Sequence, residues 1–359
     1  MSKRAILYDV DSKIPNLALM KISSFYKRMG YDAVLSRQIQ YIEGCRHFAG
    51  VVFHAPKSLE KVAALRSIYG ADIDIGGSGV DLIKRLPVEI EHSLPDYDLY
   101  PSHKTFAIGY ITRGCNNACE FCLVPVKEGI IKQVSSFEQF VPPGQRNVML
   151  LDDNLLSFHD ADRILTIIVQ RDYAVNFSQS LDIRYLNENN IELLKRVDSR
   201  NSKFTKRRFY FSCNNVATIR QFMEKRKLLS ALGEGAVTTI MMYGFSNHLS
   251  EDYQIFRMIR KLRLIPFLQE YWPIPGVPAR VSEDYFDYDL NAVIRLTFLS
   301  NGVNWEKYLR WLNRLYFKVF GKYYLPLVKI IYRYNNKERI LRYLRQPEKL
   351  TEELYKPYG

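Results

Sequence analysis

The stretch Tyr110–Pro125, which reads YITRGCNNACEFCLVP, contains three of the five cysteines of this 359-residue chain. They stand at positions 115, 119 and 122, directly after a short apolar segment that predicts a β-strand. Three thiolates in one loop can bind three irons of a cubane cluster and leave the fourth iron open, whereas closed ferredoxin clusters take four thiolates. We therefore predict that Cys115, Cys119 and Cys122 bind a [4Fe-4S] cluster.

A structural zinc site is the main alternative for the same loop. Such sites usually take four ligands, often as two Cys-x2-Cys pairs, and the nearest histidines, His103 and His159, are not at matching spacings. Cys45 and Cys213 stand apart and are interpreted as small buried hydrophobic residues. An odd number of cysteines, three of them clustered, also argues against a secreted disulfide scaffold.

Apolar segments alternate with helical patterns on the C-terminal side of Phe106. Six of them have the character of strands: Phe106–Thr112, Asn147–Asp152, Val175–Leu181, Phe209–Ser212, Val237–Tyr243 and Pro266–Tyr271. Helical patterns separate most of them: Asp160–Gln170, Glu188–Val197, Val216–Leu228 and Ser250–Leu262. Six such units are too few for an eight-stranded barrel and predict an open, partial (β/α)6 barrel of the TIM type over residues 106–289.

Residues 1–88 show a second alternation of strands and helices. The strand patterns are Arg4–Tyr8, Asp32–Leu35, Phe48–Phe53 and Ala71–Gly79, and the helical patterns are Leu17–Gly30 and Ser58–Gly70. Ser58 is the expected cap of the second helix. This order predicts a small α/β domain with a doubly wound, Rossmann-like parallel sheet. Residues 89–105, with two prolines and no periodicity, predict a linker.

Residues 290–359 predict a helical, aromatic and basic C-terminal region. From Val303 to Gly359 there are 13 Lys or Arg and five acids, so eight of the 13 net positive charges of the chain lie there. Such a surface attracts nucleic acid, because phosphate contacts release counterions and tyrosines can stack on bases. The alternative is packing on the barrel by aromatic residues at helical spacing: Tyr308, Trp311, Tyr316 and Phe320.

The composition is that of a globular protein, with 47% hydrophobic and 25% charged residues. No stretch of about 18 uncharged apolar residues occurs, so we expect no membrane span. The opening MSKRAILYDVD predicts a first strand, not a signal peptide. We therefore expect a cytoplasmic protein.

The Cys-x3-Cys-x2-Cys spacing, with Phe121 before the last cysteine, resembles the signature of the radical S-adenosylmethionine (SAM) superfamily. The longer form RGCNNACEFCLVPVKEG is most similar to the branch that contains methylthiotransferases and enzymes with a cobalamin-binding domain. The resemblance covers about residues 106–275. It implies an enzyme whose open iron binds SAM and in which one electron cleaves the S–C5′ bond. The resulting 5′-deoxyadenosyl radical abstracts hydrogen from a substrate, and a flavodoxin or ferredoxin type of protein donates the electron.

The resemblance further implies SAM contacts on the rim of the barrel. Asp152, Asp153 and Asn154 follow the second strand, where the family contacts the SAM amino group. A loop at the carboxyl end of a barrel strand is the expected place for such polar groups. The alternative is that these three residues cap the helix that follows.

Other implied SAM contacts follow the later strands. Gln179 and Arg184 come after the third strand, and Arg184 either pairs with the SAM carboxylate or forms a salt bridge with Asp182 or Asp153. The remaining candidates are Ser212 and Asn214 for the ribose, Tyr243 and Gly244 beside the adenine, and Gln269 facing the pocket.

The N-terminal segment resembles the cobalamin-binding domain that precedes the barrel in one subgroup. The run Gly76–Gly79 lies where that domain has a glycine turn, but an Asp-x-His-x-x-Gly element that would supply a cobalt ligand is missing. We interpret the domain as degenerate, with a cobalamin-dependent methyltransferase as the alternative. An alternative of another class is a nucleic-acid-binding protein with a structural metal site.

Methylthio transfer is disfavoured. Family members with that activity carry a second cysteine trio, and this N-terminal domain has Cys45 alone. The substrate stays open among RNA, peptides and small metabolites.

Overall fold

The computed structural model describes residues 3–243, 245, 247–271, 314, 317 and 321. Most of these residues belong to two compact units. One unit contains residues 3–179 and 196–207, and the other contains residues 180–195 and the described residues from 208 onward. The predicted C-terminal region, 290–359, lies outside the described residues except for three isolated positions.

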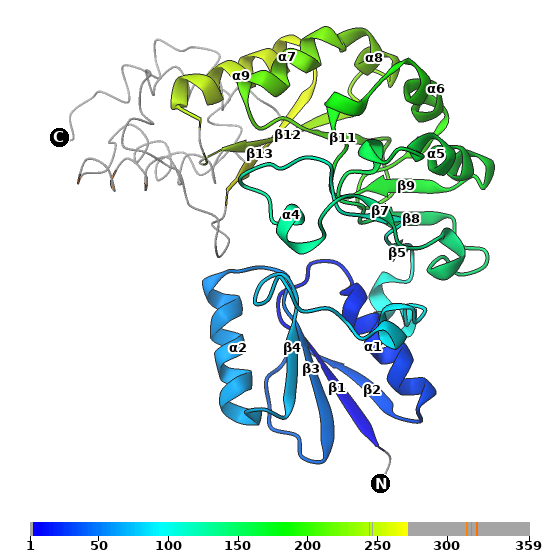
Figure 1. Cartoon of the computed structure of the whole chain (residues 1–359), viewed down its shortest axis with the longest axis vertical. Helices are drawn as coiled ribbons and strands as arrows, with labels where there is room; N and C mark the ends of the chain where they lie inside the picture. The colour runs from blue at the N-terminus through cyan, green and yellow to red at the C-terminus, as the bar shows by residue number, and fades with distance from the viewer. Residues whose placement is uncertain are drawn as a thin grey trace, which may run out of the picture. The chain divides into compact units, whose positions relative to one another are not determined.

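The first unit begins with a parallel sheet of four strands in the order β2-β1-β3-β4 (Figure 1). Its elements are β1 (Arg4–Asp9), α1 (Leu17–Arg28), β2 (Asp32–Ser36), β3 (Cys45–Gly50), α2 (Pro56–Tyr69) and β4 (Ile73–Gly76). Side chains alternate between the faces of β1, so Ala5 and Leu7 pack in the cluster that contains α1, and Ile6 and Tyr8 pack in the cluster that contains α2. The predicted doubly wound sheet is confirmed.

Two details of the N-terminal prediction are wrong. Helix α2 begins at Pro56 with Ala55 as its N-cap, and Ser58 lies inside the first turn, because the fixed φ of proline suits that turn. Strand β3 was expected to reach Phe53 but ends at Gly50. The backbone N–H groups of Val52 and Phe53 instead donate to the two carboxylate oxygens of Asp11, at 2.8 and 3.0 Å.

The segment 89–105, predicted as a linker, carries short helices and buried side chains. The helices are α3 (Val88–Glu91), η1 (Tyr97–Leu99) and η2 (Pro101–His103). Ile90, Leu99 and Tyr100 are buried in the same cluster as α1. The Tyr100 hydroxyl donates to the buried carboxylate of Asp9 at 3.1 Å. This segment is therefore part of the core of the first unit.

The first unit continues with a second parallel sheet in the order β10-β9-β8-β5 and a two-stranded antiparallel ribbon, β6-β7. The strands are β5 (Ala107–Gly109), β6 (Thr112–Arg113), β7 (Lys132–Gln133), β8 (Asn147–Leu150), β9 (Ala174–Phe177) and β10 (Asp198–Ser199). The helices are α4 (Val124–Lys127), η3 (Phe137–Gln139), η4 (Leu155–Ser157) and α5 (Ala161–Gln170). One hydrophobic cluster joins Ile108 and Met149 of this sheet to Leu7 and Met20 of the N-terminal sheet and α1.

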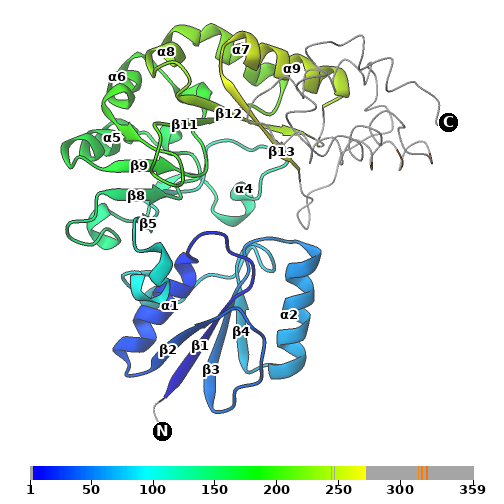
Figure 2. The same cartoon turned by 180° about the vertical axis from the view of Figure 1, so that it is seen from behind.

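The second unit holds a parallel sheet in the order β11-β12-β13, and α7 and α9 pack against each other on one face of it (Figure 2). Its elements are η5 (Ile183–Tyr185), α6 (Glu188–Arg196), β11 (Phe209–Ser212), α7 (Val216–Glu224), α8 (Arg226–Ala231), β12 (Val237–Tyr243), α9 (Leu249–Lys261) and β13 (Ile265–Glu270). All six predicted strands of the partial barrel exist and pair in parallel, so the predicted α/β class is confirmed. The helix expected over Val216–Leu228 is divided at Lys225. Among the described helices, none is long and apolar enough to cross a membrane.

Gly109 gives a first prediction, on the packing of β5. A Cβ at this position would overlap the ring of Phe140 and lie 2.8 Å from its Cδ1 atom. We expect Gly109→Ala to lower the free energy of unfolding by about 1–3 kcal/mol, the usual cost of overpacking a core, as measured by urea denaturation. Adding Phe140→Leu should recover part of this loss. Strictly additive effects of the two substitutions would contradict the contact.

His47 gives a second prediction. This β3 residue is buried, its ring packs between those of Tyr8 and Tyr69, and neither ring nitrogen has a hydrogen-bond partner in the described part of the chain. Leaving such a group unsatisfied costs about 1–3 kcal/mol. We expect His47→Leu to raise the free energy of unfolding by about 1 kcal/mol near neutral pH.

The same residue should make stability depend on pH. Burial lowers the pKa of His47 from its ordinary 6.5, because it disfavours the charged imidazolium. The unfolded chain then binds the extra proton first, so stability falls as pH drops below about 6.5 toward the lowered pKa. Urea midpoints at about pH 7.5 and about pH 5.5 should differ more for the natural chain than for His47→Leu. Equal pH dependence would show that His47 is not responsible.

Candidate metal centre and its surroundings

The three clustered cysteines lie in the loop between β6 and α4. Gly114, which precedes them, has a φ of +94°, and a Cβ there would lie 2.6 Å from the carbonyl oxygen of Ile130 and 2.7 Å from that of Gly129. The backbone N–H of Cys115 donates to the Gly129 carbonyl at 3.0 Å. The two ends of the loop therefore meet at a point where only glycine fits.

N–H groups donate to the sulfurs of Cys115 and Cys122, and all three thiols of the trio are half-buried. The backbone N–H groups of Asn117 and Val124 donate to the Sγ atoms of Cys115 and Cys122, each at 3.4 Å. The Nδ2 atom of Asn154 donates to Cys115 Sγ at 3.3 Å. Hydrogen bonds to an ionised acceptor favour its charged form, so those at Cys115 and Cys122 favour the thiolate, the form that binds iron.

The three thiols are within electrostatic reach of one another. The pKa of the Cys122 thiol is raised to about 11, chiefly by burial, with the Val124 N–H opposing the shift and the neighbouring Cys119 and Cys115 contributing to it. Among the residues that the structure describes, no three His, Cys, Asp or Glu side chains are placed to hold a single metal ion. A cubane cluster does not need three side chains around one ion, because each of three irons takes its own thiolate. The donor set of three thiols, with N–H groups at the sulfurs of Cys115 and Cys122, fits the predicted cluster.

The run Asp152–Asn154 after β8 binds the segment that leads into the cysteine loop. Asp152 is buried and accepts the N–H of Ile111 at 3.2 Å and the hydroxyl of Thr112 at 2.6 Å. Asp153 accepts the N–H of Gly114 at 2.9 Å. Successive acids thus bind successive positions of the strand and loop. The alternative that this run caps the following helix finds no support, because Asn154 makes no side-chain cap to η4.

Both carboxyl groups of this run have perturbed acidity. Burial raises the pKa of Asp152 to about 6, although its hydrogen bonds from Thr112 and Ile111 oppose the shift. Burial also raises the pKa of Asp153 to about 6, opposed by the Gly114 N–H and reinforced by the nearby Glu128. These two buried carboxyl groups therefore have pKa values closer to neutral pH than an exposed aspartate has.

The N-terminal sheet and the segment after it contact the cysteine loop from within the same unit. The Nζ atom of Lys127, on α4, donates to the Ser78 hydroxyl. Arg113 pairs with the Glu91 carboxylate at 3.0 Å, and Lys21 of α1 pairs with the same oxygen at 2.8 Å. The hydrogen bond from Lys127 to Ser78 and the ion pair between Arg113 and Glu91 therefore hold the two ends of the loop.

The glycine turn Gly76–Gly79 is occupied by the chain itself. A Cβ at Gly77 would overlap the carbonyl of Val51, and one at Gly79 would lie 2.6 Å from the carbonyl oxygen of Phe53. His54 Nδ1 lies 2.9 Å from the Gly79 carbonyl oxygen. Because Gly77 and Gly79 have no Cβ, the backbone after β3 can pack directly against this turn. These contacts do not fit a cobalamin site.

The candidates of the second unit lie at the carboxyl ends of its strands. Ser212 is half-buried at the end of β11, and Tyr243 is buried at the end of β12. Asn214 joins these two strand ends, because its Oδ1 atom accepts the N–H of Met242 at 3.3 Å. Gln269 of β13 is exposed, and Gly244 lies outside the described residues.

Arg184 forms a salt bridge with Asp182, which is the structural alternative to the predicted contact with the SAM carboxylate. Its Nε and Nη2 atoms donate to the carboxylate of Asp182 at 2.9 and 2.7 Å, in a bidentate pair. In the first unit, Gln179 is exposed and Phe121 of the cysteine loop is half-buried.

The sequence does not predict several of the residues around the centre. Thr112 and Gly129 bind Asp152 and Cys115, and Asn116 donates to the Ser157 carbonyl at 2.9 Å. Gly114, immediately before the first cysteine, and Gly129, the first glycine after the trio, were visible signals of a closed loop. The partners of Thr112 and Asn116 lie about 40 residues away and leave no local pattern.

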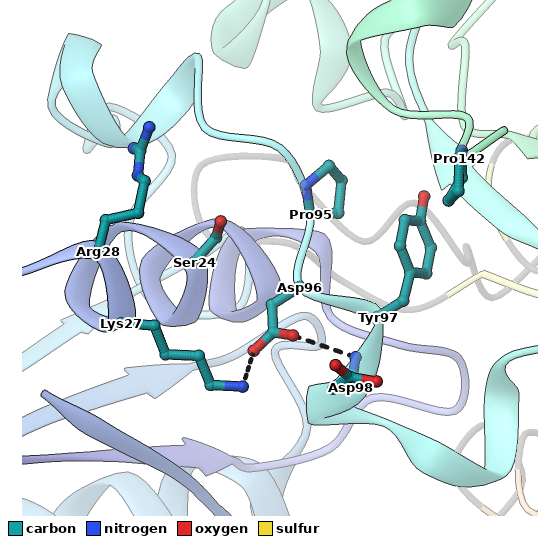
Figure 3. A pocket seen from close by; sticks show the side chains of 8 residues that line it. All are labelled: Ser24, Lys27, Arg28, Pro95, Asp96, Tyr97, Asp98 and Pro142. Carbon is teal, nitrogen blue, oxygen red and sulfur yellow. Dashed lines mark hydrogen bonds and ion pairs between the residues drawn. The ribbon is translucent and has the colours of Figure 1, made fainter. Parts of the chain in front are cut away.

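A surface hollow of about 610 Å³ lies elsewhere in the first unit, between the end of α1 and the segment after α3 (Figure 3). Its charged groups bind each other: Asp96 accepts the Lys27 ammonium at 2.7 Å and the N–H of Asp98 at 3.1 Å. Arg28 donates to the Ser93 hydroxyl at 2.6 Å. The hollow does not contain the cysteines and adds no functional group to them.

Comparison with known proteins finds relatives for this chain, although no family model matches it. The tRNA-2-methylthio-N(6)-dimethylallyladenosine synthase of Fusobacterium nucleatum is 24% identical over 213 residues, covering 44% of this chain and 49% of that protein. The synthase of the same name from Saccharopolyspora erythraea is 24% identical over 257 residues, covering 61% of this chain and 50% of that protein. The chain thus spans about half the length of these relatives.

A search of solved structures matches SuiB of Streptococcus suis bound to S-adenosylmethionine, with 12% identity and a TM-score of 0.33 over 64% of this chain and 55% of that one. The sequence relatives confirm the predicted resemblance to the radical SAM superfamily and its methylthiotransferase branch. They also support the enzyme class and the two cofactors that the resemblance implies, an iron–sulfur cluster and SAM.

Proposed function

We propose that this chain, a relative of the radical SAM methylthiotransferases, is an enzyme that cleaves SAM reductively at a [4Fe-4S] cluster bound by Cys115, Cys119 and Cys122. With the cluster and SAM bound, and with one electron from a flavodoxin or ferredoxin type of donor, the cofactors would supply cleavage of the S–C5′ bond and abstraction of a hydrogen atom from the substrate, with methionine and 5′-deoxyadenosine as products. The cofactors supply this chemistry, and the protein supplies position and exclusion of water.

The observation that carries the proposal is the construction of the cysteine loop. Gly114 lets the loop close on Gly129, Asp153 binds the entry to the loop, and N–H groups point at the sulfurs of Cys115 and Cys122. A loop held at so many points positions its thiols before iron arrives. Such preorganisation is what a catalytic centre requires of its ligands.

The other residues of the rim have assigned roles in the proposal. Asp152 and Asp153 hold the strand and loop before the first cysteine, and we assign the SAM amino group to the side of the cluster that this run borders. Arg184 is held by Asp182 through its Nε and Nη2 atoms, and it remains the candidate for the SAM carboxylate. The remaining candidates for the ribose, adenine and pocket wall are Ser212, Asn214, Tyr243, Gly244, Gln179 and Gln269.

We further propose the division of the chain that the sequence predicts. Residues 1–88 form a cobalamin-binding-like domain without cobalamin, residues 89–105 connect it to the partial barrel of residues 106–289, and residues 290–359 offer basic charge to a polyanionic substrate. Retention of stoichiometric hydroxocobalamin by the purified chain would overturn the first of these assignments.

The names of the relatives suggest RNA as the class of substrate. Their name describes synthases that modify a tRNA, so RNA is the first substrate to test. Methylthio transfer itself does not suit this chain, because the only cysteines outside the trio are Cys45 and Cys213, and Cys213 is fully buried. A second cluster with its own trio cannot be built from them.

Anaerobic reconstitution with iron and sulfide tests the proposal. We expect the brown charge-transfer absorption of a [4Fe-4S] cluster and, after addition of SAM and dithionite, 5′-deoxyadenosine detected by chromatography. Zinc bound in place of iron, with no 5′-deoxyadenosine, would favour the structural metal site. Addition of bulk tRNA should raise the rate of 5′-deoxyadenosine formation if RNA is the substrate, and an unchanged rate would count against RNA.

A further inference from the structure

Asn154 is held against the cysteine loop by its neighbours in sequence. It is 4% exposed and follows two acids whose carboxylates bind the backbone at Ile111, Thr112 and Gly114. The side chain of Asn154 then reaches the next residue of the loop, and its Nδ2 atom lies 3.3 Å from Cys115 Sγ. The three consecutive side chains thus follow the strand and loop in order, which fixes where the amide points.

This contact differs from the other N–H groups at the sulfurs. Asn117 and Val124 donate from the backbone, so they remain whichever side chains stand there. Asn154 donates from a side chain, and its burial keeps water from replacing the donor. The sequence therefore controls this one hydrogen bond by the choice of a single residue.

A hydrogen bond to a cluster thiolate changes the affinity of the cluster for an electron. The reduced cluster carries more negative charge, so an N–H dipole at the sulfur stabilises the reduced state more than the oxidised state. We propose that Asn154 sets the reduction potential of the cluster through Cys115, and so determines which electron donors can reduce it. This inference rests on the proposed function, since it requires that the three cysteines bind a cluster.

An alternative role for Asn154 is the SAM contact that the family resemblance implies. The two roles are distinguishable by measurement. A SAM contact would change the affinity for SAM, and a hydrogen bond to the thiolate changes the potential measured without SAM.

The test compares Asn154→Leu with the natural chain and with Asn116→Ala, a matched control in the same loop whose amide donates to the Ser157 carbonyl at 2.9 Å. Leucine keeps the branching of asparagine at Cγ and has no hydrogen-bond donor. Each reconstituted protein is titrated with dithionite without SAM, and the reduced cluster is quantified by electron paramagnetic resonance. We expect the ratio of reduced to oxidised cluster at a fixed potential to fall roughly tenfold in Asn154→Leu, equivalent to about −59 mV for a one-electron couple.

Three results decide the question. A midpoint potential in Asn154→Leu equal to that of the natural chain, or an equal shift in Asn116→Ala, would overturn the inference. If both Asn154→Leu and the smaller Asn154→Ala fail to assemble a cluster that Asn116→Ala retains, Asn154 holds the cluster in place and the tuning role is wrong. If the natural chain itself binds no iron, the proposed function fails before Asn154 is tested.

Discussion

Chains with alanine in place of Cys119 should lose both the cluster and the reaction. Of the three thiols, each is expected to bind a separate iron, so two remaining thiols leave one more iron without a protein ligand. We expect the charge-transfer absorption to fall with the iron and sulfide content, and 5′-deoxyadenosine to fall to the level measured without protein. Chromatography of single-turnover reactions with SAM and dithionite measures the second effect.

Cys45→Ala is the matched control for this loss. Cys45 is a half-buried thiol in β3, and its Sγ atom points to the Glu43 carbonyl oxygen at 3.5 Å, away from the loop. The control should keep its cluster and its activity. Undiminished 5′-deoxyadenosine from Cys119→Ala would remove Cys119 from the set of ligands, and loss of activity in Cys45→Ala would point to damage unrelated to the trio.

The second large effect is expected from Gly114→Ala, which changes no ligand. A methyl group there meets the carbonyl oxygens of Gly129 and Ile130, at 2.7 and 2.6 Å, and these are backbone atoms that cannot turn aside. The loop must open, and Cys115 moves with it because its N–H is bonded to Gly129. Since a misplacement of about 1 Å at a reacting centre can cost about 100-fold in rate, we expect a loss of that order in SAM cleavage.

Gly144→Ala separates this clash from the cost of backbone conformation. Gly144 has a φ of +79°, close to the +94° of Gly114, but nothing lies within 4 Å of a Cβ at that position. Alanine should therefore cost about 1–2 kcal/mol of stability and leave cluster content unchanged. Equal activities in the two variants would show that the close approach at Gly114 does not position the trio.

Periodicity predicted the elements of the fold well, because each depends on its own stretch of sequence. The strands at Phe209–Ser212 and Val237–Tyr243 have the predicted bounds. Apart from the helix divided at Lys225 and the short helices of the segment 89–105, the errors fall at the ends of elements. Pro56 begins α2 in place of Ser58, and Asp11 takes the N–H groups of Val52 and Phe53 that an extended β3 would have used.

The site was predictable in its members and not in its contacts. Cys115 and its two companions are visible from spacing, and Asp152–Asn154 are visible because they follow a strand. The hydrogen bond from Asn154 to Cys115 joins positions that are 39 residues apart. The ion pair between Arg184 and Asp182 depends on the local geometry of the loop, which the sequence pattern does not show. The spacing of residues along the sequence predicts which of them lie at the same edge of the sheet. Which of them form hydrogen bonds with one another depends on loop conformations, and periodicity does not predict these.

The core that joins the two sheets of the first unit bears on how such a chain can arise. Leu7 and Met20 bury their side chains in the same cluster as Ile108 and Met149, and Glu91 balances cations from α1 and from the strand before the cysteines. A gene truncated at the start of the barrel would encode a protein with a bare apolar face and an unbalanced Arg113. Recombination that exchanged the amino-terminal sheet for an unrelated one would have to replace this face as well. The two sheets are therefore expected to be inherited as a single unit of descent.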